Sequence, residues 1–137
     1  MLLGHPKEGL LVMLKILALI LSLSLCSFTY AEGIFLESPE DAFALSEETK
    51  LDVLLVFTAD WCPNCVQMKK DIIENISVVD NYIVCYVDYD KRADMVKEYK
   101  VKRIPDYMIY KNKKEIKRKV GYNGINQFKN WLTSPNK

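Results

Sequence analysis

Two cysteines with two residues between them are the side chains of this sequence best suited to chemistry. Cys62 and Cys65 stand in the segment Trp61-Cys62-Pro63-Asn64-Cys65. A thiolate attacks a disulfide sulfur, so the leading cysteine of such a pair must ionise near neutral pH. We therefore expect Cys62 to attack and Cys65 to resolve the mixed disulfide, with their own disulfide as the redox group and no further cofactor.

The elements on either side of the pair are predicted to place Cys62 at the start of a helix. Residues 53–57 (VLLVF) form a continuous apolar run, as expected for a strand that is buried on both faces. The helical pattern begins directly after Cys62, and Pro63 suits a first turn because it has no N–H to leave unpaired. Unpaired N–H groups at a helix N-terminus favour an anion, and one helical turn brings the Cys65 sulfur within bonding reach.

The remaining periodicity predicts one α/β domain, with helices on both faces of a sheet. After a short strand or coil, the predicted order of elements is α, β, α, β, α, β, β, α. Further strands are expected at residues 82–87, 107–110 and 115–120, and the last two form a hairpin.

Helix starts and a buried helix face can also be predicted. Ser38 and Pro39 predict a helix start, Asp90 is expected to cap a short helix through residues 95–99, and Asn123 is expected to cap the last helix. The last helix is amphipathic, and its predicted buried face consists of Ile125, Phe128, Trp131 and Leu132.

The N-terminal segment has the composition of a signal peptide. Residues 16–25 (ILALILSLSL) are apolar and uncharged and follow Lys15. Ten helical residues span roughly half of a ~30 Å hydrocarbon core, so we favour a cleaved leader over a retained membrane anchor. Thr29-Tyr30-Ala31 offers small residues for cleavage, which predicts a leader of residues 1–31 and a domain of residues 32–137. An exported protein of the periplasm or cell envelope is expected.

The charge balance argues against a nucleic-acid partner. The chain has 19 basic and 18 acidic residues, so no net charge attracts it to a polyanion. Residues 32–90 hold 3 basic and 13 acidic side chains, whereas residues 91–137 hold 14 and 4. We interpret this asymmetry as attraction between two parts of one monomeric domain rather than as a polyanion site.

The motif and a distant proline together resemble the thioredoxin family. The segment WCPNC lies between a predicted buried strand and a helix start, and Ile104-Pro105 follows with the proline 43 residues after Cys62. The resemblance covers residues 34–132 and implies a central mixed sheet, with the redox cysteines at a helix N-terminus opposite a cis-proline. It also implies that Trp61 packs beside the sulfurs and that Ile104 lends its backbone to a bound substrate strand next to Pro105. The sequence ADWCPNC, preceded by Thr58, is similar to the periplasmic electron-relay domains of bacterial thiol-disulfide interchange proteins.

Two positions in the predicted strands depart from the pattern of cytosolic thioredoxins. Val56 stands where that family has a buried aspartate that accepts a proton, and Tyr86 stands in place of the lysine beside it. Proton transfer from Cys65 must then use water, Asp60 or another group. Asp106 follows the proline directly, and we expect its negative charge to select basic or polar partners.

Other interpretations of the cysteines and of a basic run remain open. Zinc needs four ligands, but residues 32–137 add only Cys85 to the pair and contain no histidine, so no metal is expected. Cys85 is predicted to be inert core. The run Lys111, Lys113, Lys114, Lys117, Arg118 and Lys119 is expected to protect a sheet edge rather than to attract a membrane surface.

The sequence thus predicts an exported thiol-disulfide oxidoreductase that acts on protein thiols and disulfides. An upstream redox partner is expected to return its cysteine pair to the starting redox state. The alternative is a non-catalytic binding module in which Cys62 and Cys65 form a structural disulfide. The motif does not fix the direction of electron flow, because such pairs occur in both reductants and oxidants.

Overall fold

The computed structural model describes residues 7–23 and 33–135. The chain divides into two units, residues 1–30 and residues 31–137. In the first unit the described element is helix α1 (Lys7–Leu23). None of the described helices combines the length and the apolar character needed to cross a membrane. The predicted cleavage site at residues 29–31 lies outside the described residues.

The second unit is built on a five-stranded mixed sheet with the strand order β1-β3-β2-β4-β5. The first three of these neighbours, β1 (Ile34–Leu36), β3 (Tyr82–Asp88) and β2 (Asp52–Thr58), run parallel. Strand β4 (Asp106–Lys111) is antiparallel to β2, and β5 (Lys114–Val120) is antiparallel to β4. The predicted α/β class, the element order and the mixed sheet are confirmed.

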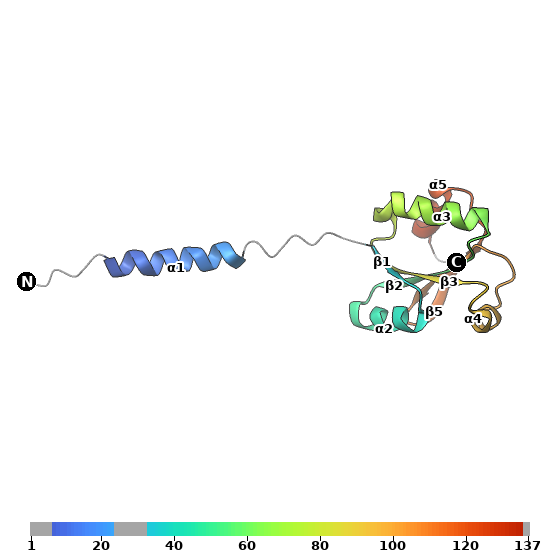
Figure 1. Ribbon diagram of the computed structural model, residues 1–137, viewed down its shortest axis with the longest axis horizontal. Coiled ribbons are helices and arrows are strands. Elements are labelled where there is room, and N and C mark those ends of the chain that lie inside the picture. Colours follow the sequence, from blue (N-terminus) through green and yellow to red (C-terminus); the bar gives the residue numbers. More distant parts are fainter. Residues whose placement is uncertain (1–6, 24–32, 136–137) are drawn as a thin grey trace, which may run out of the picture. The chain divides into compact units, whose positions relative to one another are not determined.

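Helices cover both faces of the sheet (Figure 1). One face carries α3 (Pro63–Glu74) and α5 (Ile125–Thr133), and the other carries α2 (Pro39–Thr49) and α4 (Ala93–Glu98). Strand β2 lies between these layers, and its residues 53–58 are all buried, which explains its continuous apolar run. A 3₁₀ helix, η1 (Ile76–Val78), follows α3 and was not predicted.

The helix starts confirm one capping prediction and overturn two. The Ser38 side chain accepts a hydrogen bond from the Asp41 N–H at 3.2 Å, so Ser38 is the N-cap of α2. Asp90 does not cap α4, because the N-cap of that helix is Arg92, two residues later in the chain. Gly124, rather than Asn123, is the N-cap of α5, and its positive φ of 92° is a conformation that glycine adopts without strain.

The predicted buried face of α5 is confirmed at two of its four positions. Phe128 and Leu132 are buried, whereas Ile125 and Trp131 are only partly buried against the same core. Helix α5 packs against β4, which is next to the edge strand β5, and its Ile125 and Trp131 side chains are therefore not fully covered. Tyr107 of β4 contacts the rings of both Phe128 and Trp131 edge-on.

The basic run on the β4–β5 hairpin does more than protect an edge. Strand β5 is the last strand of the sheet, as the edge interpretation requires. Lys117, however, donates hydrogen bonds to the carbonyl oxygens of Trp131, Leu132 and Ser134 at the end of α5. Lys113 pairs with Glu47 of α2, which joins the basic and acidic parts of the domain. These two lysines therefore stabilise tertiary contacts.

Candidate active site

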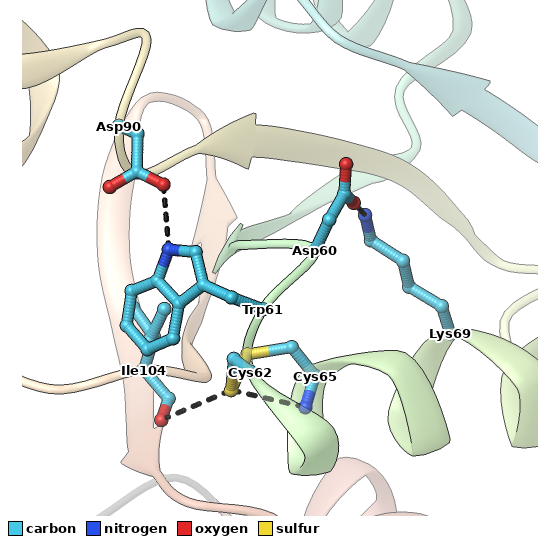
Figure 2. Close-up of a disulfide and its surroundings, with 7 residues drawn as sticks. All are labelled: Asp60, Trp61, Cys62, Cys65, Lys69, Asp90 and Ile104. Carbon is cyan, nitrogen blue, oxygen red and sulfur yellow. Dashed lines mark hydrogen bonds and ion pairs between the residues drawn. A yellow bond between two sulfur atoms is a disulfide. The ribbon is translucent and has the colours of Figure 1, made fainter.

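The two motif cysteines lie at the N-terminus of α3 and are joined as a disulfide. Cys62 is the N-cap residue, and its sulfur accepts a hydrogen bond from the Cys65 N–H at 3.3 Å (Figure 2). Pro63 occupies the first helical position, as predicted. The Cα atoms of the pair are 5.2 Å apart. A negative charge on the Cys62 sulfur would thus be stabilised by a backbone donor and by the helix dipole.

The two sulfurs differ in access. Cys62 retains 5% of its surface, whereas Cys65 is fully buried. Because the attacking sulfur must meet a partner and the resolving sulfur needs only to meet its neighbour, this difference fits the roles predicted for Cys62 and Cys65.

Trp61 presents a large apolar surface directly before the attacking cysteine. Its side chain is 64% exposed, and its Nε1–H donates a hydrogen bond to Asp90 at 2.7 Å. Figure 2 shows this bond orienting the indole beside the disulfide. An exposed aromatic ring held in one orientation suits contact with a protein partner.

The loop before β4 faces the attacking sulfur. The peptide bond between Ile104 and Pro105 is cis, as the family resemblance implied. The carbonyl oxygen of Ile104 lies 3.8 Å from the Cys62 sulfur (Figure 2). Within residues 33–135 the Ile104 N–H has no hydrogen-bond partner, whereas the Pro105 carbonyl accepts one from the Gly121 N–H at 2.7 Å. The loop therefore brings a backbone donor without a partner next to the disulfide.

The carboxylate of Asp106 is not exposed beside Pro105. This overturns the prediction that its charge selects basic or polar partners. The residue is 1% exposed, and both of its carboxylate oxygens accept hydrogen bonds from Arg118 of β5, at 3.0 and 2.5 Å. The register of the hairpin makes this contact, because Asp106 pairs with Val120 and Met108 pairs with Arg118. Arg118 also donates to the carbonyl of Tyr99 at 3.0 Å, so it ties together both ends of the loop at residues 100–105.

The position of the family's buried aspartate is apolar here. Val56 is fully buried and lies opposite Tyr86 in the β2–β3 register. The Tyr86 hydroxyl is buried and has no hydrogen-bond partner among the described residues, and burial raises its pKa to about 12. The ammonium of Lys69 lies 5.3 Å from the centre of the Tyr86 ring and 3.9 Å from Asp60. These polar groups line a pocket of about 290 Å³ at the ends of β2 and β3.

Cys85 occupies the middle of β3 and is fully buried in the core on the α2 side of the sheet. Its thiol is free, and burial raises its pKa to about 12. A thiol with this pKa holds almost no thiolate at neutral pH, so the prediction of inert core is confirmed.

An α/β sheet with a Cys-x-x-C disulfide at a helix N-terminus, opposite a cis-proline, defines the thioredoxin class of fold. Comparison with known proteins agrees: the family model described as Thioredoxin matches residues 38–134. The chain belongs to the thioredoxin family.

Curated relatives agree with this family, and a solved structure shares the fold. It is 31% identical to a thioredoxin of Rickettsia felis over 87 residues, which cover 62% of this chain and 82% of that protein. It is 28% identical to a thioredoxin H-type of Fagopyrum esculentum, over 59% of this chain and 70% of that one. The structure of Trxlp from Edwardsiella tarda superposes with a TM-score of 0.64 at 20% identity, covering 73% of this chain and 99% of that chain. The protein is therefore a thiol-disulfide oxidoreductase of this family, with Cys62 and Cys65 as its cysteine pair.

Sequence reasoning missed one residue that shapes the site. Arg118 was placed in a run of edge lysines, yet it closes the loop that carries the cis-proline. A signal was present, because Asp106 lies at the start of an apolar strand, and a buried carboxylate needs a basic partner. Which of the six basic residues on the hairpin supplies that partner depends on strand register, which the sequence does not state.

Proposed function

We propose that this protein is an exported thiol-disulfide oxidoreductase that exchanges disulfides with other proteins through Cys62 and Cys65. The observation that carries the proposal is the position of the Cys62 sulfur. It accepts a backbone N–H at the start of α3, faces the Ile104 carbonyl, and belongs to a residue that keeps 5% of its surface accessible directly after the exposed Trp61.

In the reductive direction the reduced protein begins as a thiolate at Cys62 and a thiol at Cys65. The Cys62 thiolate attacks one sulfur of a protein disulfide, which forms a mixed disulfide and releases the other sulfur as a thiolate. Cys65 loses its proton and attacks the Cys62 sulfur, so the Cys62–Cys65 disulfide forms and the second partner sulfur leaves as a thiolate. The partner gains two electrons and, with two protons, two thiols. An upstream dithiol partner restores the reduced pair, and the reverse sequence oxidises a partner.

No buried aspartate can accept the proton of Cys65, because Val56 occupies the position where cytosolic thioredoxins have one. Asp60 is almost fully exposed, with 94% of its side-chain surface accessible. We propose that water, rather than a side chain in the core, accepts the proton that Cys65 loses.

Trp61, Ile104 and Pro105 form the proposed partner-binding surface. Trp61 supplies apolar contact area, and the Ile104 N–H and carbonyl are positioned to pair with an extended partner segment beside the disulfide. Pro105 lies under this segment and has no N–H of its own. No metal and no cofactor besides the disulfide is proposed, and the domain is proposed to act as a monomer.

Export rests on the N-terminal composition. The uncharged apolar run at residues 16–25 and the small residues near Ala31 support a signal peptide, with an uncleaved anchor as the alternative. The periplasm or cell envelope is the proposed location.

The test is to trap partners on the attacking cysteine. Full-length Cys65→Ser protein, expressed with its leader, should accumulate mixed disulfides on Cys62, because the resolving thiol is gone. Cys62→Ser protein serves as the matched control and should trap none. If both variants remain free of mixed disulfides under oxidising and reducing conditions, catalysis is excluded.

A reduction potential separates the proposed enzyme from a binding module with a structural disulfide. A working couple should lie between about −120 and −270 mV, whereas structural disulfides lie below about −300 mV. Equilibration of the full-length protein against glutathione or dithiothreitol buffers measures this potential.

A further inference from the structure

We propose that the partner segment that reaches Cys62 carries acidic residues next to its own cysteine, on the side that faces residues 100–105. The inference deepens the proposed function and rests on it. It concerns Lys102 and Arg103, which follow α4 and directly precede Ile104.

Lys102 and Arg103 are exposed, and they directly precede the residue whose carbonyl oxygen faces the Cys62 sulfur. The carbonyl of Ile104 is 3.8 Å from the Cys62 sulfur, so Arg103 is one residue and Lys102 two residues from a contact with the reacting atom. Two residues of chain span at most roughly 7 Å. Together with the 3.8 Å to the sulfur, this places the Lys102 backbone on the order of 10 Å from the reacting atom. The Debye length is about 30 Å at 0.01 M salt, so at low salt both cations act on a segment bound at the sulfur.

These two cations have no ion-pair partner in the described part of the chain. Three acidic residues near the site have ion-pair partners within residues 33–135. Asp106 is bound by Arg118, Asp88 by Lys91, and Asp60 lies 3.9 Å from Lys69. By contrast, neither Lys102 nor Arg103 has a carboxylate oxygen within 4.0 Å. Their charge is therefore available to a partner.

The burial of Asp106 determines the sign of the charge beside the cis-proline. An exposed carboxylate after Pro105 would have offset one of the two cations. Because Arg118 neutralises it inside the protein, the loop presents three exposed positive charges, those of Lys100, Lys102 and Arg103, and no exposed negative charge. The same arginine holds the carbonyl of Tyr99, so the loop that displays the cations is fixed at both ends.

The acidic groups of the site lie at Trp61 instead. Asp90 accepts the Trp61 Nε1–H, and Asp60 directly precedes Trp61. The site is thus positive at the cis-proline loop and negative at the tryptophan. This polarity orients a charged partner segment as well as attracting it.

The test compares three peptides that differ only in charge. Each has nine residues with one central cysteine, held as a mixed disulfide with 2-mercaptoethanol, and is flanked by glutamates, lysines or serines. Full-length reduced protein is mixed with each peptide, and disulfide formation at Cys62–Cys65 is followed by mass spectrometry of quenched samples. Rates are divided by the rate of the same peptide with dithiothreitol, a neutral reductant, which removes the intrinsic reactivity of each disulfide.

The glutamate peptide should react at least about fivefold faster than the lysine peptide at about 20 mM salt, and the ratio should approach one at about 0.5 M. The double substitution Lys102→Glu with Arg103→Glu should reverse the preference. The matched control is Lys111→Glu with Lys114→Glu, which makes the same change in net charge at the far end of β4, roughly 17 Å from Asp106. It should retain the preference of the unchanged protein.

The outcomes separate this inference from the proposed function. Equal normalised rates for the acidic and basic peptides, or an unchanged preference in the Lys102→Glu, Arg103→Glu protein, would overturn the charge inference alone. Loss of the preference in the control protein would show that net charge, and not this loop, is responsible. Absence of exchange with the serine peptide would overturn the proposed function and this inference with it.

Discussion

The domain holds thiols in two regions, the start of α3 and the middle of β3, and only one of them is arranged for chemistry. At the start of α3 the Cys62 sulfur has a backbone N–H donor, a neighbouring thiol one turn away and a route to the surface. In β3 the Cys85 thiol is fully buried among apolar side chains. The same residue type is therefore placed for nucleophilic attack in one region and is a core residue in the other.

Two buried polar groups of the domain differ in whether they have a hydrogen-bond partner. Asp106, close to the disulfide, is buried but receives two hydrogen bonds from Arg118. Tyr86 follows Cys85 in β3 but packs on the opposite face of the sheet, and its buried hydroxyl has no partner among the described residues. The buried carboxylate of Asp106 is thus fully paired, whereas the buried hydroxyl of Tyr86 is tolerated without a partner.

The sharpest test of this contrast is to remove each thiol. Cys62→Ser should lower disulfide exchange with a peptide substrate by at least about a thousandfold, since the hydroxyl is a far weaker nucleophile near neutral pH. Cys85→Ala should leave the rate within about twofold, because that thiol touches neither the disulfide nor the surface. Stopped-flow or quenched assays of full-length protein measure both rates.

A large loss of rate in Cys85→Ala protein that is still folded would contradict the comparison. Circular dichroism separates this outcome from unfolding, since Cys85→Ala leaves a small cavity that costs about 1 kcal/mol.

The Asp106–Arg118 pair offers the next largest effect. Arg118→Met leaves a carboxylate that is 2% exposed without its partner, so the free energy of unfolding should fall by about 3 kcal/mol. Urea unfolding of the oxidised protein measures the change. Lys119→Met is the matched control, because Lys119 points to the other face of β5, and it should change stability by less than about 0.5 kcal/mol.

A second variant decides whether the unpaired charge causes this loss. Asp106→Leu combined with Arg118→Met removes both partners and should recover much of the stability, since an apolar pair of similar volume replaces the ions. If the double variant is no more stable than Arg118→Met alone, lost packing and not the isolated carboxylate is responsible.

The fold and the reacting cysteines were predictable because the signals for them are local. The apolar run in β2 and the helix start at Pro63 lie on either side of Cys62 in the sequence, so their order alone places the sulfur at a helix N-terminus. The cis bond at Pro105 followed from family resemblance, because no local pattern distinguishes it from a trans bond.

The errors arose where the answer depends on distant partners. Asp106 was expected to be exposed, because nothing in its neighbourhood in the sequence reveals that strand register brings Arg118 to it. Asp90 was expected to cap a helix, but its side chain instead accepts the Trp61 N–H from 29 residues away. Tertiary hydrogen bonds thus redirected both acids from the local roles that their types favour.

A pH titration should reveal Cys85 by its effect on stability. Burial raises the pKa of its thiol to about 12 in the folded protein, above its value in the unfolded chain of about 8.5. As the pH rises, the Cys85 thiol therefore ionises in the unfolded chain before it ionises in the folded protein. Its contribution to the free energy of unfolding is fully present below pH 8.5. Above that pH the contribution falls by up to about 1.4 kcal/mol per pH unit until pH 12. The Cys85→Ala protein should not show this loss of stability, because it has no thiol at position 85.

The measurement is the difference in unfolding free energy between the unchanged protein and Cys85→Ala at pH 7, 9 and 10. The other buried phenols and thiols titrate alike in both proteins, so their effects cancel. The advantage of the unchanged protein should shrink as the pH rises. A difference that stays constant from pH 7 to 10 would show that Cys85 ionises as readily in the fold as outside it.

The smallest effect compares two tyrosine hydroxyls. The Tyr122 hydroxyl donates a hydrogen bond to Asp71 of α3 at 2.5 Å, and Tyr122→Phe should therefore cost about 1 to 2 kcal/mol of unfolding free energy. Tyr86→Phe removes a hydroxyl that has no partner in residues 33–135, so it should leave stability unchanged or raise it slightly, because the burial of an unpaired hydroxyl already costs free energy. Urea unfolding of the two variants side by side measures the contrast. A loss of more than about 1 kcal/mol in Tyr86→Phe would mean that this hydroxyl has a bonding partner, and that β3 is as well satisfied as the region around the disulfide.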